Sequence, residues 1–231
     1  LYLAGKGAKV ALLEKEARLF QKASLVNQAR LHGGYHYPRS IVTAAMSDEH
    51  KERFTEEHRQ FVNFSFEKYY AIDRFSSFTD PLQFERFCEY LNIRCERILE
   101  HNLFNFNRLE ALYRTEEFSF DPVLLKEFYT QKVENTPGIS VFKNTRAQTA
   151  HTDGQEWVLE ITSNEPQTPN FNLHTPVVIN ATYAATNAVN RLFGVEDLAL
   201  THEISEIAFV NPPQFNGKGL TVMDGPFGSI M

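Results

Sequence analysis

The 231 residues carry a formal net charge of −6, and 42% of them are hydrophobic, including 20 phenylalanines. This composition suits one large domain or two modest ones with a well-packed interior. An acidic chain is a poor partner for nucleic acid, which basic surfaces bind, and no apolar run reaches the about 18 residues of a membrane span. The sequence therefore predicts a soluble globular protein whose partner is a small molecule, and it leaves the oligomeric state open.

Both ends of the sequence have the pattern of a longer chain. Residues 1–3 resemble the last turn of an apolar helix, and the Gly5-Lys6-Gly7 segment would end it, because glycine commonly follows a helix C-terminus. Residues 225–231 come directly after a strand-like run. We expect a helix that begins before Leu1 and a further element after Met231.

The elements of the N-terminal part are one strand, one long loop and one helix. The apolar run at residues 9–14 ends in an acid, which is typical of a buried parallel strand. Residues 24–40 have no clean period and contain two adjacent glycines, so they are predicted to form a loop. Ser47 can N-cap a helix that extends to about Phe66, since two acids follow it in the first turn.

Two further helix starts share one signal. Asp80-Pro81 and Asp121-Pro122 each place proline directly after an N-capping aspartate. Between them, residues 94–119 are rich in strand formers and charges, which indicates a partly exposed antiparallel ribbon. The only cysteines, Cys88 and Cys95, match neither a zinc spacing nor a CxxC pair, and we expect two thiols in a reducing cytoplasm.

The C-terminal part reads mainly as strands. Residues 139–143 and 156–162 are predicted strands, and Asp153-Gly154 suits a hairpin turn before the second of them. A small-residue turn and a helix ending at Gly194 come later. Three more strands are expected at residues 177–180, 202–210 and 218–223. Parallel-type strands with antiparallel pieces between them predict an α/β nucleotide-binding domain that carries an α+β domain.

Glu14 has the position of a ribose ligand. An acid at the end of the second strand of a βαβ unit hydrogen-bonds ribose hydroxyls in dinucleotide-binding folds. The glycine fingerprint should then stand about twenty residues earlier, before Leu1. The alternative interpretation is that Glu14 is a hydrated residue after a buried strand.

The loop at residues 24–40 is the densest functional signal. Gly33 and Gly34 allow the backbone to lie close to a flat or anionic ligand. Arginine side chains bind phosphate or carboxylate in a bidentate manner, and histidine and tyrosine add polar edges and aromatic faces. The side chains concerned are Arg30, His32, Tyr35, His36, Tyr37 and Arg39. Alternatively, the glycines form only a tight turn and the aromatic residues only a cluster.

Five segments in this order resemble the FAD-dependent oxidoreductases of the D-amino-acid oxidase type, which include glycine oxidase and 2-hydroxyglutarate oxidase. The segments are residues 10–15, 24–40, 120–122, 177–182 and 224–229. The resemblance covers nearly the whole chain and implies FAD as a non-covalent cofactor. It implies a Rossmann-like, three-layer but incomplete FAD-binding domain at residues 1–68 and 119–200. A substrate domain on an antiparallel sheet would comprise residues 69–118 and 201–231.

The resemblance also implies a set of cofactor-binding residues. Glu14 and Lys15 would bind the adenosine ribose, and residues 24–34 would run under the pyrophosphate and along the isoalloxazine. The residues implied in that loop are Ser24, Asn27, Gln28, Ala29, Arg30, Leu31, Gly33 and Gly34. Arg146 and Ala147 would contact the adenine side, and Ala181 and Thr182 the diphosphate. Members of the family often have glycine soon after the position of Ala181, whereas this sequence has Tyr183 and Ala184 after Thr182.

The expected reaction is oxidation of a small amine, amino acid or hydroxy acid by hydride transfer to the flavin. His32 and His36 are the candidate catalytic residues, since histidine has a pKa suited to acid–base work. Tyr35, Tyr37 and Arg39 are expected to face the substrate, and no metal site is predicted. Two alternatives remain open, a nicotinamide-dependent Rossmann dehydrogenase and a flavin-free binding module on the same fold.

Overall fold

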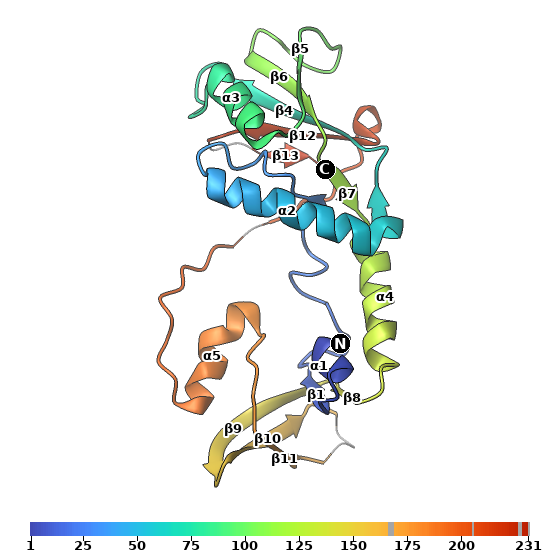
Figure 1. Cartoon of the computed structure of the whole chain (residues 1–231), viewed down its shortest axis with the longest axis vertical. Helices are drawn as coiled ribbons and strands as arrows, with labels where there is room; N and C mark the ends of the chain where they lie inside the picture. The colour runs from blue at the N-terminus through green and yellow to red at the C-terminus, as the bar shows by residue number, and fades with distance from the viewer. Residues whose placement is uncertain (166–168, 205, 226–227, 231) are drawn as a thin grey trace. The chain divides into compact units, whose positions relative to one another are not determined.

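The computed structural model describes all residues except 166–168, 205, 226–227 and 231. The chain forms two compact units (Figure 1). Residues 1–25 and 126–206 make up the first unit, and residues 26–125 and 207–231 make up the second. Residues 26–68 and 119–125, which the sequence assigns to the FAD-binding domain, therefore belong by their contacts to the second unit. The division into an FAD-binding and a substrate domain concerns function and stays a prediction.

The first unit begins with a short helix and a parallel strand pair. The helix α1 (Tyr2–Gly5) leads through Gly7, whose φ is +88°, into β1 (Val10–Leu13). The strand β1 pairs in parallel with β8 (Ile139–Phe142), which confirms the predicted strand direction. Its side chains are half-buried or exposed rather than fully buried, so the expectation of a buried strand is wrong for this structure. Only one neighbouring strand covers it among the described residues.

An antiparallel sheet completes the core of this unit. It has the strand order β11-β10-β9 and consists of β9 (Thr145–Asp153), β10 (Glu156–Ser163) and β11 (Phe171–Thr175). The chain turns at Gly154, whose φ of +60° suits glycine, and the predicted hairpin is confirmed. Val158, Leu159 and Ile161 are its buried apolar side chains.

Two predicted strands are absent. Residues 177–180 form no strand, and Val177 and Ile179 are 67% and 66% exposed. The described residues of 201–210 form no strand either, and Phe209 is 93% exposed. Both segments are apolar enough for a strand, but in the described structure no neighbouring strand supplies a ladder for their backbone groups. The helical segment between them is confirmed.

That helical segment is made of short pieces. It comprises η2 (Tyr183–Ala185), α5 (Thr186–Asn190) and η3 (Arg191–Phe193), and it ends at Gly194 with a left-handed φ of +67°. Tyr183 also has a positive φ, +54°. This backbone geometry favours glycine, which agrees with the residue type often found near this position in the related family.

The second unit is built on a five-stranded mixed sheet in the order β13-β12-β4-β6-β5. Its strands are β4 (Glu67–Asp73), β5 (Cys95–Ile98), β6 (Leu109–Thr115), β12 (Lys218–Met223) and β13 (Ser229–Ile230). The strands β5 and β6 form the predicted antiparallel ribbon, and β12 confirms the strand expected at residues 218–223. β12 runs parallel to β4, whereas the other pairs are antiparallel.

The side chains of β4 alternate between two hydrophobic clusters. Tyr70 and Ile72 join the main core with Tyr35, Phe84 and other residues of α3 (Pro81–Leu91), whereas Tyr69 and Ala71 face the cluster on the other side of the sheet. As the sequence predicts, α3 is N-capped by Asp80, whose carboxylate accepts the Gln83 N–H at 2.8 Å. Period-two alternation of this kind places Lys68 on the same side as Tyr70.

The long helix of the unit starts earlier than predicted. α2 spans Ile41–His58, and its N-cap is Ser40 rather than Ser47. Ser47 lies inside the helix and donates its hydroxyl to the Thr43 carbonyl at 2.9 Å. Ala44, one turn inside the helix start, is fully buried, and this tertiary contact outweighs the local capping signal at Ser47. The helix also ends before Phe66, where η1 (Arg59–Phe61) and β3 (Val62–Asn63) follow.

A small antiparallel sheet supports the loop of residues 24–40. It has the order β2-β7-β3, with β2 (Arg30–Leu31) and β7 (Phe118–Phe120). Beyond it, α4 (Pro122–Glu134) begins at the predicted Asp121 cap, whose Oδ1 accepts two backbone N–H groups at 2.9 and 3.0 Å. The last short helix is η4 (Pro213–Phe215).

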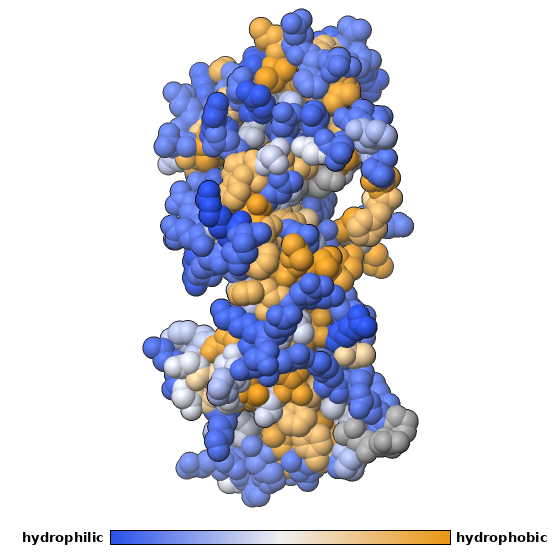
Figure 2. Space-filling model, turned by 90° about the vertical axis from the view of Figure 1, so that its right-hand side faces the viewer, coloured by the Kyte–Doolittle hydropathy of each residue, from blue (hydrophilic) through white to orange (hydrophobic). Residues whose placement is uncertain are grey.

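The surface is largely hydrophilic with several separate apolar areas on the face that Figure 2 shows. Among the described residues, no helix has the length and apolar character needed to cross a membrane. Nor does any group of three or more His, Cys, Asp or Glu side chains in that part of the chain have a metal-binding arrangement.

Candidate functional site

The candidate site lies in the second unit, on the loop that leads into and out of β2. Asn27 starts it with a local turn, because its Oδ1 accepts the Ala29 N–H at 2.7 Å and Ala29 has a φ of +51°. β2 then pairs with β7 through Arg30 and Leu31. This pairing buries Arg30 and Leu31 and leaves His32 at the edge.

Gly34 holds the loop against α2. Its φ is +90°, and a Cβ atom there would lie 2.8 Å from the Ala44 carbonyl oxygen. A side chain at Gly33 would stand 3.0 Å from the Tyr35 ring. The paired glycines therefore serve a tight turn and close helix packing, as one of the two interpretations of the sequence expects. Their predicted contact with a cofactor stays a prediction.

A buried cluster of charges lies behind this turn. The Glu117 carboxylate is fully buried, accepts the Tyr70 hydroxyl at 2.7 Å and has Arg30 Nε 3.5 Å away. It also accepts the Gly33 N–H at 3.4 Å. Lys68 is fully buried as well, and desolvation, with the Arg30 charge, lowers the pKa of its ammonium to about 7. Two basic side chains and one carboxylate thus share a poorly hydrated interior.

Sequence reasoning missed Glu117 and Lys68. Glu117 follows Glu116 and has the appearance of a hydrated strand end, and Lys68 follows Glu67 in the same way. The signal available was the alternation of β4, in which Lys68, Tyr70 and Ile72 share one face. Because Tyr70 and Ile72 are largely apolar, their face of the strand is expected to be buried, and Lys68 with it.

His32 stands between this cluster and the surface. Its Nδ1 lies 3.9 Å from Glu117 Oε1 and is buried without a hydrogen-bond partner among the described residues. The side chain as a whole is 40% exposed. Burial lowers the pKa of the imidazole to about 4, with further lowering by the charges of Arg30 and Lys68. The ring is therefore neutral at neutral pH.

His36 lies next to Arg30. Its Nδ1 is 3.4 Å from Arg30 NH1, and its ring contacts Tyr37 edge-on with centroids 5.5 Å apart. Desolvation, followed by the charges of Arg30 and His32, lowers the pKa of its imidazole. Desolvation, reinforced by the Arg30 charge, therefore favours the neutral form of His36.

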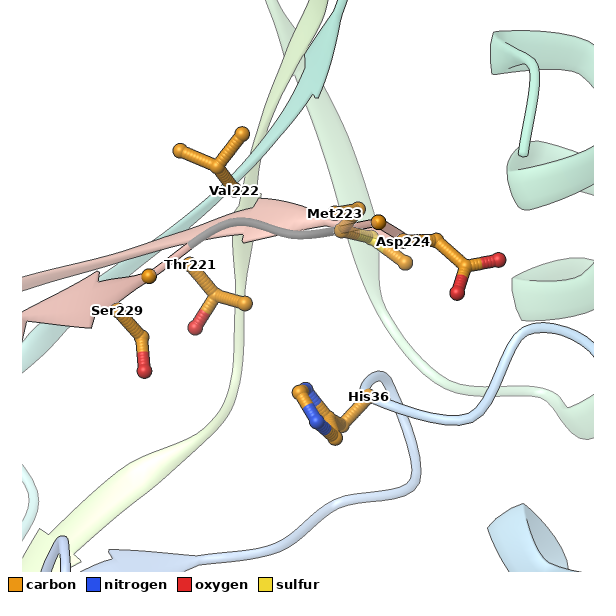
Figure 3. Close-up of a pocket in the computed structure, with 8 residues that line it drawn as sticks. His36, Thr221, Val222, Met223, Asp224 and Ser229 are labelled. Atoms are coloured by element: carbon orange, nitrogen blue, oxygen red, sulfur yellow. The ribbon is translucent and has the colours of Figure 1, made fainter. Parts of the chain in front are cut away.

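A cavity of about 190 Å³ opens beside His36. It is bounded by the ends of β12 and β13, and its wall includes Thr221, Asp224 and Ser229 (Figure 3). The Asp224 carboxylate accepts a bidentate pair of hydrogen bonds from Arg39, at 2.7 and 3.0 Å, and one from the hydroxyl of Thr79 at 2.7 Å. These contacts lower the pKa of the Asp224 carboxyl despite the opposing effect of partial burial.

The predicted substrate residues differ in their placement. Tyr35 is 1% exposed in the main core and donates its hydroxyl to the Arg94 carbonyl at 2.7 Å, which favours a packing role over contact with a ligand. Tyr37 is half-buried beside His36, and Arg39 is exposed. Gln28 is exposed and donates to Ser229 Oγ at 3.3 Å.

The first unit brings together two of its predicted nucleotide-binding segments. Glu14 follows β1, and its carbonyl accepts the Thr145 N–H at 2.9 Å, so the strand end lies beside the start of β9 with Arg146 and Ala147. The Glu14 carboxylate accepts the Glu16 N–H at 2.9 Å. Lys15 and Ser24, which also belong to this unit, are exposed.

The third predicted nucleotide-binding segment contains Ala181 and Thr182, which are both exposed. The side chain of Asn180 organises the turn here, because its Oδ1 accepts the Thr182 N–H at 3.2 Å and the Thr182 hydroxyl at 2.7 Å. Its amide group donates to the Thr186 carbonyl at 2.9 Å. Asn180 thus forms a turn, whereas the sequence predicts it at the end of a strand.

Comparison with known proteins identifies the class. Residues 1–227 match the family described as FAD dependent oxidoreductase, abbreviated DAO, and the chain belongs to this family. The resemblance seen in the sequence is therefore confirmed, and so is the Rossmann-like fold class of that family. No curated protein matches the sequence.

Three solved structures illustrate the likeness of the fold. L-α-glycerophosphate oxidase from Mycoplasma pneumoniae, described with FAD bound, has a TM-score of 0.57 at 16% identity, covering 79% of this chain and 50% of its own. Glycine oxidase from Geobacillus kaustophilus has a TM-score of 0.56 at 14% identity, with coverages of 81% and 52%. L-proline dehydrogenase from P. horikoshii has a TM-score of 0.54 at 16% identity, with coverages of 84% and 52%. The chain thus spans about half the length of these relatives.

Proposed function

We propose that the protein is an FAD-dependent oxidoreductase that oxidises a small amine, amino acid or hydroxy acid by hydride transfer to the flavin. The observation that carries the proposal is the family match over residues 1–227, which includes the loop with His32 and Gly33. Family membership favours FAD over the nicotinamide alternative. The solved relatives named above act, by their descriptions, on glycine, L-proline and glycerophosphate, all small molecules.

The residues present fit a flavin dinucleotide. Glu14 stands at the end of a parallel strand, where dinucleotide folds hold a ribose. The backbone of residues 27–34 would approach the cofactor, and His32 in this loop has a side chain that is 40% exposed. FAD supplies the hydride acceptor when bound, and the protein supplies binding, orientation and electrostatics.

His32 is the proposed residue for handling a proton. The lowered pKa keeps its ring neutral, and the tautomer with the proton on Nδ1 directs that proton towards the Glu117 carboxylate, 3.9 Å away. Nε2 is then left as an acceptor on the exposed side. It would accept a hydrogen bond from the hydroxyl or amine group of the substrate and orient the carbon that loses hydride.

The first experiment is the absorption spectrum of the protein as its gene encodes it. We expect bound flavin after purification, and anaerobic bleaching of the visible flavin bands by small amines, amino acids or 2-hydroxy acids. A protein that takes up no FAD would overturn the proposal in favour of a flavin-free binding module. A bound flavin that no member of these classes reduces would overturn the proposed substrate class.

The second experiment is Glu14→Ala, which should weaken FAD binding about tenfold to a hundredfold, because charge-assisted hydrogen bonds contribute roughly 1.5–3 kcal/mol. Glu14→Gln keeps an oxygen for the Glu16 N–H and isolates the loss of charge. Glu16→Ala is the control, since Glu16 pairs at the surface with Lys22 at 3.1 Å. Unchanged FAD affinity in Glu14→Ala removes this residue from the site.

The proposed location is the cytoplasm. Cys88 and Cys95 are both free thiols, which suits a reducing compartment. Fractionation of the native cells, with the protein detected by antibody, tests this proposal.

A further inference from the structure

The cavity at the ends of β12 and β13 has one polar wall. Figure 3 shows the hydroxyls of Thr221 and Ser229 on the same side of these strands as the His36 ring, while Val222 points to the other side. Behind the hydroxyls lies Arg30, whose side chain is 1% exposed. Its NH2 group donates to Thr221 Oγ1 at 3.2 Å and to Ser229 Oγ at 3.0 Å. One buried guanidinium therefore organises this wall.

The hydrogen-bond inventory decides where the Ser229 proton points. A guanidinium only donates, so Ser229 Oγ accepts from Arg30 and also accepts from the Gln28 amide at 3.3 Å. Both lone pairs of the hydroxyl are then in use, and its O–H is left to donate. Ser229 lines the cavity, and the cavity is where an acceptor for this proton can be placed.

Thr221 does not compete for the same acceptor. Its hydroxyl accepts from Arg30 and hydrogen-bonds the Tyr70 oxygen. Because the Tyr70 hydroxyl donates to Glu117 at 2.7 Å, the proton in the Thr221–Tyr70 bond comes from Thr221. The Thr221 proton thus points inward, away from the cavity.

The same inventory decides the tautomer of His36. Arg30 NH1 is 3.4 Å from His36 Nδ1 and can only donate, so Nδ1 accepts and the proton of the neutral ring is on Nε2. His36 therefore contributes an N–H donor, and Ser229 contributes an O–H donor, to one small cavity.

The charges around the cavity favour an anion. In the interior Glu117 opposes Arg30, and Lys68 adds a positive charge when it is protonated. The Asp224 carboxylate on the wall is paired with Arg39 through a bidentate contact. Desolvation and then the Arg30 charge lower the pKa of His36, against the opposing effect of Glu117. Charge-assisted hydrogen bonds to a carboxylate are stronger than hydrogen bonds to a neutral oxygen, so these N–H and O–H donors favour an anion.

We propose that His36 Nε2 and Ser229 Oγ form a pair of donors that binds a carboxylate of the substrate, with Arg30 as the positioning residue that orients both. This inference rests on the proposed function and narrows its substrate to acids, excluding simple amines. The cavity volume of about 190 Å³ accommodates a carboxylate with a short carbon chain.

The test compares propionate with propionamide, which has the same shape without the charge. Dissociation constants are measured by ligand-observed NMR on the methyl signal, with the protein as its gene encodes it, first without and then with added FAD. We expect propionate to bind at least tenfold more tightly than propionamide. Ser229→Ala and His36→Leu should each weaken propionate binding about tenfold, whereas Ser229→Thr and His36→Gln keep a donor and should retain most of it.

The role of Arg30 has its own readout, because substituting this buried residue would also disturb folding. ¹⁵N spectra of the wild-type protein should show His36 protonated on Nε2 and not on Nδ1. A proton on Nδ1 would mean that Arg30 does not set the tautomer, and it would overturn the positioning role.

The outcomes separate the two proposals. Equal affinity for propionate and propionamide, or propionate binding that is unchanged in Ser229→Ala, overturns the inference even if the protein carries FAD. Charge-selective binding that depends on Ser229 in a protein that never takes up FAD supports the anion site and overturns only the oxidoreductase proposal.

Discussion

Lys68 gives the structure a pH-dependent stability that a single substitution should remove. The side chain is fully buried on β4, and desolvation together with the Arg30 charge lowers the pKa of its ammonium from 10.5 to about 7. Between these values the unfolded chain binds a proton that the folded protein has released. The free energy of unfolding should therefore rise as the pH increases from about 7 towards 10.5, and this contribution is absent below about pH 7.

The expected change in the free energy of unfolding follows from the lowering of the Lys68 pKa. Each pKa unit corresponds to about 1.4 kcal/mol, so Lys68 should add on the order of 2 kcal/mol between pH 7 and pH 9. In Lys68→Met this rise should be missing, while the Arg30–Glu117 pair remains. Other groups titrate in both proteins and cancel in the difference between them.

The assay is urea unfolding followed by far-ultraviolet circular dichroism at pH 6, 7, 8 and 9. Lys218→Met is the matched control, because Lys218 lies on the neighbouring strand β12 with a 30% exposed side chain and pairs with Glu67 at 3.2 Å. Its difference from the wild type should not change with pH. Parallel curves for the wild type and Lys68→Met would refute the assignment of a lowered pKa to a buried lysine.

Three further predictions test the turn, a helix cap and His32. Gly34→Ala should destabilise the protein by about 1–3 kcal/mol or more, because a Cβ atom would lie 2.8 Å from the Ala44 oxygen. Gly154 also has a positive φ, +60°, but has open space around it, so Gly154→Ala should destabilise the protein less in the same urea assay. Asp80→Ala should lose about 1 kcal/mol of unfolding free energy, which Asp80→Asn restores. NMR of His32 should show titration near pH 4, and a midpoint near the ordinary value of about 6.5 would contradict its burial.

The elements that the sequence predicts well depend on neighbouring residues. The caps at Asp80 and Asp121 act on N–H groups two or three positions away, and the hairpin turn at Gly154 joins adjacent strands. The helix start at Ser47 is an instructive failure. A good capping residue was present, but the burial of Ala44 under Gly34 moved the start of α2 back to Ser40 and Ile41.

Part of the candidate site was accessible from the loop sequence, but its chemistry was not. His32, His36 and Arg30 were singled out because of their residue types beside paired glycines. The neutral state of both histidines depends first on desolvation and then on the positive charge of Arg30, with a smaller effect of Lys68. Lys68 is 36 positions from His32 in the chain, and no local pattern connects the two.

The sequence by itself determined the family, the loop that carries the candidate site, and the local caps and turns, because these depend on residue types at short and regular spacings. Only the tertiary structure decided which charges are buried and which hydroxyls face the cavity. Glu117 meets a hydroxyl 47 positions away on β4, and Arg30 meets one 191 positions away on β12. Burial and electrostatic fields arise from such long-range contacts, and they set the protonation states on which the proposed chemistry depends.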